Sequence, residues 1–369
     1  MDGSSRSNFK PQLDALRALA VCAVLVHHFL PVENVISQQV FHLGLVGLLG
    51  VLLFFVLSGY LITGLLLRSR EQDWRTALAN FYLRRTLRIF PIYYLTLLVL
   101  ALLQSLPVSE FIYWHVAYVS NALFVLNPSA AADSAHFWTL SVEEQFYLVW
   151  PLLVLLVPYR HLLRVILWAI VTGICWKVFV LQTLGDHLAG ALAMVSCLDS
   201  LAMGAALAFI EQDNKLNRYR NAFLRAALIV GGMLVLLQVF LIVTGQARGL
   251  VLVTAYAGPS LVFVWLVGSA AQGFKGVTGV WLEWRVLLYI GKISYGIYLY
   301  HNFMPRLVRY VASVVGVGEL SDLPTFVCAT TVTLLTAAAS WHFIEKPISR
   351  MKERLSVAAI RHPAAISIT

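Results

Sequence analysis

The stretch from Leu13 to Phe29, LDALRALAVCAVLVHHF, carries charged and titratable side chains inside a segment apolar enough to cross a bilayer. Such groups are costly in a membrane and mark candidate functional sites. Arg17 and His28 are eleven residues apart, which on an α-helix is about 20° past three full turns and roughly 16 Å along the axis. They share one face, whereas His27 falls about 80° away. A cation and an imidazole on one stripe indicate two ends of one binding site; the alternative is that Arg17 extends to lipid headgroups and His28 only bonds a neighbouring helix.

The composition is that of a polytopic membrane protein. The 369 residues are 60% hydrophobic and 12% charged, and apolar runs of 18 or more residues recur along the chain. We expect an all-α fold and one integral-membrane domain over 1–369, with a transmembrane bundle over about 13–347 and a basic cytoplasmic tail over 348–369. About ten transmembrane helices are predicted, at 13–30, 44–67, 90–107, 141–157, 161–182, 190–210, 223–244, 249–270, 287–311 and 323–344.

The lysines and arginines predict the orientation of these spans. All but four of the 27 fall in the two termini or in segments on one side of a ten-span arrangement. Because basic residues gather on the cytoplasmic side, both termini are predicted to be cytoplasmic in a multi-pass protein of the inner cell membrane. The net charge of +9 is then explained by the membrane orientation and does not indicate binding to nucleic acid. The four cysteines have no metal-ligand spacing, so no metal site is expected.

A cluster of arginines lies between the second and third predicted spans, in FYLRRTLRIFP from Phe81 to Pro91. Arg85 and Arg88 are three residues apart and share a face on a helix. The topological explanation is the excess of basic residues at the cytoplasmic end of a span. The functional alternative is a fork for phosphates, which Arg binds in bidentate fashion. Because Arg17 lies at the same predicted face, we expect these three arginines to meet an anionic cytoplasmic ligand with several phosphates.

Two adjacent acids stand in the apolar stretch 136–151, HFWTLSVEEQFYLVWP. Glu143 and Glu144 are expected to begin a helix at its outer end, with Ser141 or Thr139 as N-cap. The helix dipole favours carboxylates there. It does not explain two acids in a segment that soon enters lipid, so at least one is expected to face the bundle interior and to be functional.

Two further motifs have a structural and a functional explanation. Ser58-Gly59, in FFVLSGYLIT, is most simply a small-residue site for close helix packing. Tyr298 and His301, in ISYGIYLYHNFMP, are three residues apart and share a helix face. A buried His beside a Tyr serves structure as often as catalysis, and both possibilities stay open.

Together these stretches resemble the acyltransferase-3 family of integral membrane acyltransferases, which O-acylate surface polysaccharides, nodulation factors and macrolide sugars. The resemblance rests on LDALRALAV with its Arg-x10-His spacing, FFVLSGYLI, RRTLRIFP, LSVEEQFYLVWP, SYGIYLYH and FIEKP, in family order over about 13 to 347. It implies ten spans and an acyl-CoA donor, usually acetyl-CoA. It also implies that His28 is the catalytic histidine and that Arg17, Arg85 and Arg88 are essential, on the donor.

Two departures from the family pattern bear on the acceptor and on packing. Ala15 stands where the family often has Gly, and the SGNH hydrolase-like domain of two-domain members is not expected, since the chain ends soon after the last predicted span. The acceptor therefore stays open among carbohydrate-type hydroxyls, such as those of a surface polysaccharide, a glycolipid or a glycosylated small molecule.

The predicted function is an O-acetyltransferase. His28 would act as the base that deprotonates the acceptor hydroxyl or as the nucleophile that carries the acyl group, and Glu143 or Glu144 would orient its imidazole. The alternatives are a transporter of an anionic or proton-coupled solute and a membrane scaffold whose polar residues only join helices.

Overall fold

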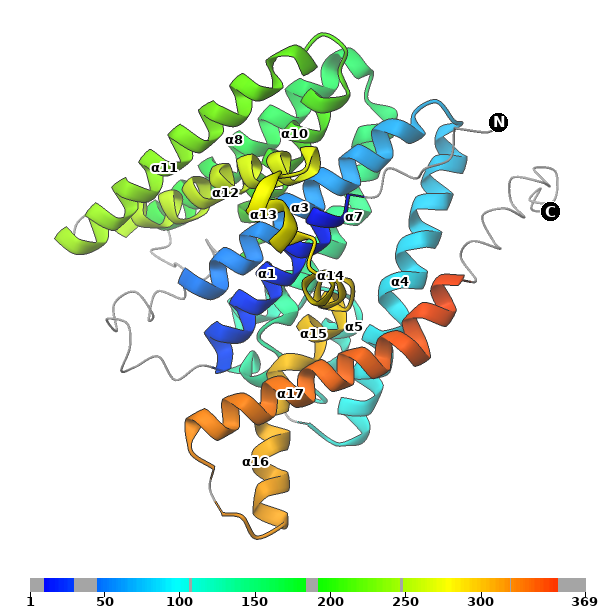
Figure 1. Ribbon diagram of the computed structural model, residues 1–369, viewed down its shortest axis with the longest axis vertical. Coiled ribbons are helices and arrows are strands. Elements are labelled where there is room, and N and C mark those ends of the chain that lie inside the picture. The colour runs from blue at the N-terminus through cyan, green and yellow to red at the C-terminus, as the bar shows by residue number, and fades with distance from the viewer. Residues whose placement is uncertain are drawn as a thin grey trace.

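Figure 1 shows the computed structural model, in which the regular elements of the described residues are all helices. The structure describes residues 10–29, 45–105, 108–183, 192–245, 248–318 and 320–350. Residues 351–369 of the predicted basic tail and residues 1–9 therefore lie outside the described ranges.

Nine helices within these ranges are long and apolar enough to cross a membrane. The protein is thus an integral, multi-pass membrane protein, and the predicted all-α class is confirmed. The helices are α1 (Pro11–Phe29), α3 (Leu45–Ser69), α4 (Trp74–Leu102), α7 (Phe137–Leu156), α8 (Tyr159–Thr183), α10 (Met194–Gln212), α11 (Arg220–Thr244), α12 (Arg248–Gln272) and α17 (Asp322–Ser340).

Shorter helices connect these spans. The aromatic stretch before α7 folds into α5 (Ile112–Val116), α6 (Ser120–Leu126), η2 (Pro128–Ala130) and η3 (Ala132–Ser134). Elsewhere lie η4 (Asn217–Tyr219), α13 (Gly276–Leu282) and η6 (Trp341–Glu345), a short π-helical segment that continues α17.

The span predicted over 287–311 is broken into pieces. These are α14 (Arg285–Lys292), α15 (Ser294–Tyr300), η5 (His301–Phe303) and α16 (Met304–Val314), and none is long enough to cross a membrane alone. Pro305 lies in the first turn of α16, where its missing N–H is tolerated, whereas within a continuous helix it would remove a hydrogen bond. The break at η5 leaves His301 in an irregular segment.

Two predicted helix starts are wrong, and both corrections move candidate residues deeper into helices. α4 begins at Trp74, not near residue 90, with Asp73 as N-cap accepting a hydrogen bond from the Thr76 backbone N–H (3.1 Å). Its arginine cluster consequently lies within the helix, not in a loop. α7 begins at Phe137, so Glu143 stands nearly two turns inside it.

The two predicted N-caps of α7 are also wrong. The hydroxyls of Thr139 and Ser141 donate to the backbone carbonyls of His136 and Phe137 (both 3.0 Å). Both residues lie inside the helix, so neither can cap its start.

Small residues bring helix backbones into contact. A Cβ at Gly59 of α3 would lie 1.8 Å from the Leu201 carbonyl oxygen of α10, and one at Gly204 would lie 2.1 Å from the Val56 oxygen. The prediction that Ser58-Gly59 allows close packing is therefore confirmed for Gly59. A third contact joins α1 to α14, where a Cβ at Gly291 would lie 1.9 Å from the Asp14 carbonyl oxygen.

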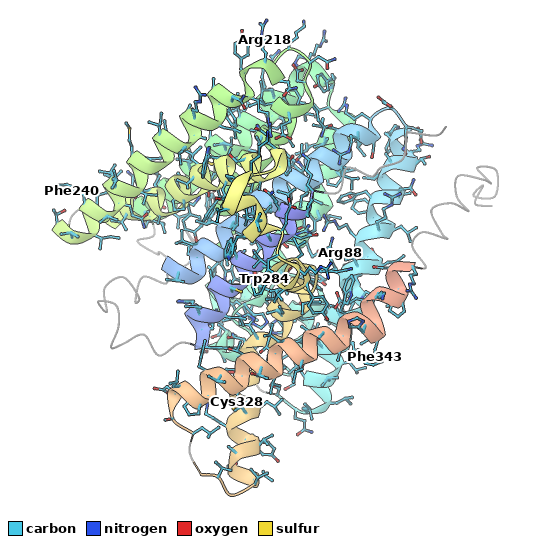
Figure 2. All side chains as sticks on the ribbon, in the orientation of Figure 1. Arg88, Arg218, Phe240, Trp284, Cys328 and Phe343 are labelled. Atoms are coloured by element: carbon cyan, nitrogen blue, oxygen red, sulfur yellow. The ribbon has the colours of Figure 1, made fainter. Side chains whose placement is uncertain are left out.

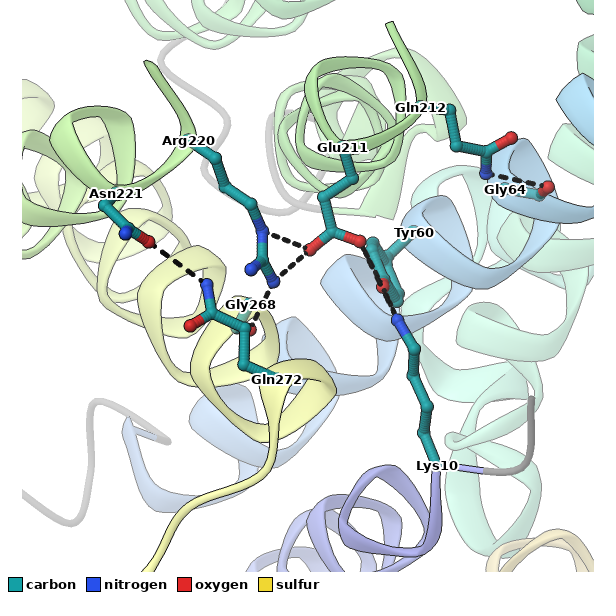
Figure 3. A network of polar contacts seen from close by, with 9 residues as sticks. All are labelled: Lys10, Tyr60, Gly64, Glu211, Gln212, Arg220, Asn221, Gly268 and Gln272. Carbon is teal, nitrogen blue, oxygen red and sulfur yellow. Dashed lines mark hydrogen bonds and ion pairs between the residues drawn. The ribbon is translucent and has the colours of Figure 1, made fainter. Parts of the chain in front are cut away.

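A polar network holds the start of α1 against four other helices (Figure 3). Lys10 donates to the Tyr60 hydroxyl (2.8 Å), which donates to the Glu211 carboxylate (2.6 Å). Arg220 donates to the same carboxylate (2.8 Å) and to the Gly268 carbonyl (2.8 Å). The network fixes the helix that carries Arg17 and His28.

Further contacts tie the connecting turns together on one face of the bundle. Arg70, after α3, donates to the Val157 carbonyl (3.0 Å), and the Tyr159 hydroxyl donates to the Asp213 carboxylate (3.1 Å). We call this face the basic face. It carries Lys10 and Arg220 of Figure 3, Arg70, and the basic residues of the same connecting turns and helix ends: Arg68, Arg75, Arg160 and Arg218.

Candidate active site

An interior cavity of about 90 Å³ lies among α1, α3, α4, α7 and α15. Five of the six predicted site residues line it: Arg17, Arg85, Arg88, Glu143 and Glu144. The arginines come from α1 and α4 and the acids from α7, so three helices supply the charges. The sequence placed the acids and arginines toward opposite membrane faces; the structure brings them to one cavity.

The carboxylate of Glu143 is held from α3 and from its own helix. The Ser58 hydroxyl donates to it (2.7 Å), and the Tyr147 hydroxyl donates to Ser58 (3.0 Å). The Arg85 guanidinium lies over the Tyr147 ring, 4.5 Å from its centroid, within reach of a cation–π contact. The result is a fixed acid beside a fixed cation, both facing the cavity.

A second, larger cavity of about 490 Å³ adjoins the first, and we call it the vestibule. Arg17, Arg88 and Tyr295 line both spaces, so these three side chains lie at the boundary where the two spaces meet. Arg285 and Lys292 of α14 add two cations to the vestibule wall. Figure 2 shows Arg88 beside α14 in the middle of the bundle.

The vestibule lies toward the end of α1 that starts at the basic face. Asp14 and Arg17, from the first two turns of α1, both line it. They form an ion pair (2.8 Å) that fixes the Arg17 guanidinium at the boundary between the two spaces.

His28 lies outside the cavity, in the last turn of α1, within a group of rings that we call the histidine cluster: His28, His136 and His301. The His28 and His301 ring centroids are 5.1 Å apart, and those of His301 and His136 are 4.9 Å apart. His28 is exposed, whereas the other two are buried. The cluster therefore connects an accessible imidazole to the interior.

Thr139 and Tyr298 separate the histidine cluster from the cavity. Both line the cavity, and their hydroxyls are 2.5 Å apart. Behind them, His301 Nδ1 donates to the Tyr298 carbonyl (2.7 Å) and His136 Nε2 donates to the Leu299 carbonyl (3.0 Å). Tyr298 lies on the cavity side of this wall and His301 on the side of the histidine cluster, and the hydrogen bond between them joins the two sides.

The expected contact between a glutamate and the His28 imidazole is absent from the described residues. The rings next to His28 there are His27 and His301, and Glu143 bonds Ser58 instead. From the sequence alone, Ser58 is predicted only as a packing residue, and nothing singles out Tyr147. The sequence does carry one signal that Ser58 is functional: it is a polar residue directly before a packing glycine within an apolar span.

Among the described residues, no group of three or more His, Cys, Asp or Glu side chains is arranged to hold a metal ion. The rings of the histidine cluster contact one another through their faces and edges. One nitrogen of His136 and one of His301 each donate to a backbone carbonyl.

The helical membrane bundle thus brings together a cationic vestibule, an acid-lined cavity and an imidazole beyond that cavity. The family model described as "Acyltransferase domain" matches residues 10–342. The chain therefore belongs to the acyltransferase-3 family, and the resemblance drawn from its motifs is confirmed.

Curated relatives of this chain are O-acetyltransferases by name. The putative O-acetyltransferase SAS0844 of Staphylococcus aureus (strain MSSA476) is 27% identical over 94% of this chain and 58% of its own length. The peptidoglycan O-acetyltransferase OatA of Listeria monocytogenes is 28% identical over 93% of this chain and 56% of its own length. The chain thus spans little more than half the length of the relatives it matches. No solved structure matches it.

Proposed function

We propose that the protein is a membrane O-acyltransferase that moves an acetyl group from acetyl-CoA to a hydroxyl of a carbohydrate-type acceptor. One observation carries the proposal: Arg17 and Arg88 lie at the boundary between a basic vestibule and a cavity lined by Glu143 and Glu144. The names of the relatives support acetyl as the transferred group. The name peptidoglycan O-acetyltransferase supports a surface polysaccharide as the acceptor class.

The donor has a shape that fits the two spaces. Coenzyme A carries phosphates at one end and its thioester at the other, joined by a narrow pantetheine arm. The phosphates would bind in the vestibule, where Arg17 and Arg88 can make bidentate contacts. The arm would pass between them into the smaller cavity, beside Arg85. We place the basic face in the cytoplasm, where basic residues gather and acyl-CoA is made.

His28 is the proposed catalytic residue, roughly 16 Å from Arg17 along α1. Acting as a base, its imidazole would take the acceptor hydroxyl proton while the oxygen attacks the thioester carbonyl carbon. The carbon–sulfur bond then breaks, and coenzyme A leaves as the thiol after receiving that proton. Acting instead as nucleophile, the imidazole would carry the acetyl group to the acceptor in two steps.

The wall formed by Thr139 and Tyr298 sets a condition on this chemistry. The thioester reaches the histidine cluster only past the hydrogen bond between those two hydroxyls, so we propose that this contact opens when the donor binds. Glu143 would act from inside the cavity, where the Ser58 hydroxyl holds its carboxylate and Arg85 lines the same space, as the thioester end of the donor arrives.

Hydrolysis of labelled acetyl-CoA by the purified protein tests the proposal, with water in place of the acceptor. We expect slow release of acetate that falls about 100-fold or more in His28→Ala, the scale of a lost general base. His161→Ala, whose side chain contacts Arg160 at the basic face, is the matched control and should keep the wild-type rate. Equal rates in His28→Ala and wild type would overturn the catalytic assignment, and binding without any turnover would favour the carrier alternative.

A further inference from the structure

One row of side chains on α14 faces the vestibule. Arg285, Leu288, Tyr289 and Lys292 all line it, at positions i, i+3, i+4 and i+7 of the helix, which share one face. The two cations at the ends of the row are about 10 Å apart along the axis. Neither Arg285 nor Lys292 lines the inner cavity, so the row belongs to the outer part of the space.

An aromatic ring from η6 stands opposite this row. Trp341 lines the vestibule, and the Lys292 ammonium lies 5.3 Å from its ring centroid. The Tyr289 hydroxyl is 3.2 Å from His342 Nε2, which fixes the tyrosine while 38% of its surface stays exposed. The outer vestibule therefore offers two aromatic faces beside two cations, a combination on which a nucleobase stacks.

The charge of the vestibule is not balanced by its own acids. Arg17 is paired with Asp14, but none of the ion pairs formed within the described ranges includes Arg88, Arg285 or Lys292. Glu345 is the other acid of the lining. Three cations against one acid leave an excess positive charge that attracts a ligand with more than one phosphate.

The vestibule is also large enough for a nucleotide. Its volume of about 490 Å³ falls within the roughly 300–1,000 Å³ typical of small-molecule sites. Coenzyme A bears phosphate at two separate places, the diphosphate next to the pantetheine arm and the 3′-phosphate on the ribose beside adenine. Arg88, at the boundary with the inner cavity, would bind the diphosphate, which leaves the outer cations for the 3′-phosphate.

We propose that α14 and Trp341 form a subsite for the 3′-phosphoadenosine end of the donor. Arg285, with Lys292, binds the ribose 3′-phosphate, and adenine lies against the Tyr289 and Trp341 rings. The inference rests on the proposed function, because it assigns the outer half of the same donor site. It predicts that the protein selects coenzyme A over the otherwise identical molecule without the 3′-phosphate.

Binding of coenzyme A and of 3′-dephospho-coenzyme A to the purified full chain tests the subsite. We expect wild type to bind coenzyme A at least tenfold more tightly. In Arg285→Ala this preference should fall to threefold or less, with little change for the dephospho compound, and Lys292→Ala should reduce it in part. Arg285 is exposed at the start of α14, so its removal leaves no cavity in the core.

Arg218→Ala is the matched control, since this exposed arginine lies far from Arg88 (Figure 2), and its ratio should stay at the wild-type value. Equal binding of the two compounds by wild type overturns the subsite while leaving the proposed function intact. An equal loss for both compounds in Arg285→Ala also overturns it, because that result reports general attraction, as for a lipid headgroup surface. Failure of wild type to bind coenzyme A at all overturns the proposed function and the subsite together.

Discussion

Gly291→Ala tests whether the spacing of α1 and α14 sets the donor site. The Cβ it adds would lie 1.9 Å from the Asp14 carbonyl oxygen, where ordinary contact begins near 3.4 Å. The two helices must therefore part by about 1.5 Å, the difference of those distances. Asp14 holds Arg17 (2.8 Å) and Gly291 adjoins Lys292, so the shift moves vestibule cations on facing helices apart.

The expected cost has a stability part and a functional part. Overpacking a close contact costs about 1–3 kcal/mol, which lowers the unfolding temperature. A misplacement of about 1 Å in a binding site can cost on the order of 100-fold in rate. We therefore expect Gly291→Ala to hydrolyse acetyl-CoA at least tenfold more slowly than wild type, measured as initial rate per folded protein at a temperature below its unfolding transition.

Gly232→Ala is the matched control for that variant. A Cβ at Gly232, also inside a helix, meets nothing within 4 Å, so alanine there should stabilise α11 by about 0.5–1 kcal/mol and leave hydrolysis unchanged. If Gly291→Ala folds and turns over acetyl-CoA like Gly232→Ala, the spacing of α1 and α14 does not set the donor site and our reasoning is wrong.

Three further predictions follow from the site and the topology. Arg88→Ala should weaken acetyl-CoA binding about ten- to a hundredfold, since a hydrogen bond to a charged group is worth about 1.5–3 kcal/mol. Arg88→Lys should recover little of that loss. Arg75→Ala, on the exposed first turn of α4, should bind acetyl-CoA normally. If all three variants give the same binding titration, the arginines do not form a phosphate-binding fork. Glu143→Gln replaces the carboxylate that Ser58 holds at the cavity with a neutral amide. The hydrolysis rate should fall about 100-fold or more, the scale of a lost acid–base group, and an unchanged rate would remove this acid from the mechanism. In a cysteine-free background, a cysteine at the exposed Ser129 should label from outside intact cells, and one at the exposed Thr76 only after permeabilisation; labelling of both from one side contradicts the orientation.

The sequence predicted the membrane class and most spans because long apolar runs determine them directly. It missed where α4 and α7 begin, since both start in mixed polar stretches whose hydropathy is low although their backbone is helical. It also predicted one continuous helix over 287–311, which the structure breaks at Ile293 and at His301–Phe303. Hydropathy averages over such breaks, and the irregular backbone persists where neighbouring helices surround it.

Within the candidate site, relations along one helix could be predicted and relations between helices could not. The spacing of Arg17 and His28 follows from helix geometry and holds in the continuous α1. That Ser58 donates to Glu143, across α3 and α7, depends on how those helices pack, which no periodicity encodes. Outside the site, the same holds for Lys177, a charge within a predicted span, whose partner at 2.7 Å is Asp199 of α10.

The central claim is that acetyl-CoA enters from the cytoplasmic side through the basic vestibule and reacts at His28. Acetyl-CoA is too highly charged to cross a bilayer, so sealed membrane vesicles of opposite orientation separate the two faces. We predict that inside-out vesicles hydrolyse externally added acetyl-CoA in a His28-dependent manner and that sealed right-side-out vesicles do not. Hydrolysis by sealed right-side-out vesicles would contradict the account. So would hydrolysis at the wild-type rate by inside-out vesicles that carry the His28→Ala variant.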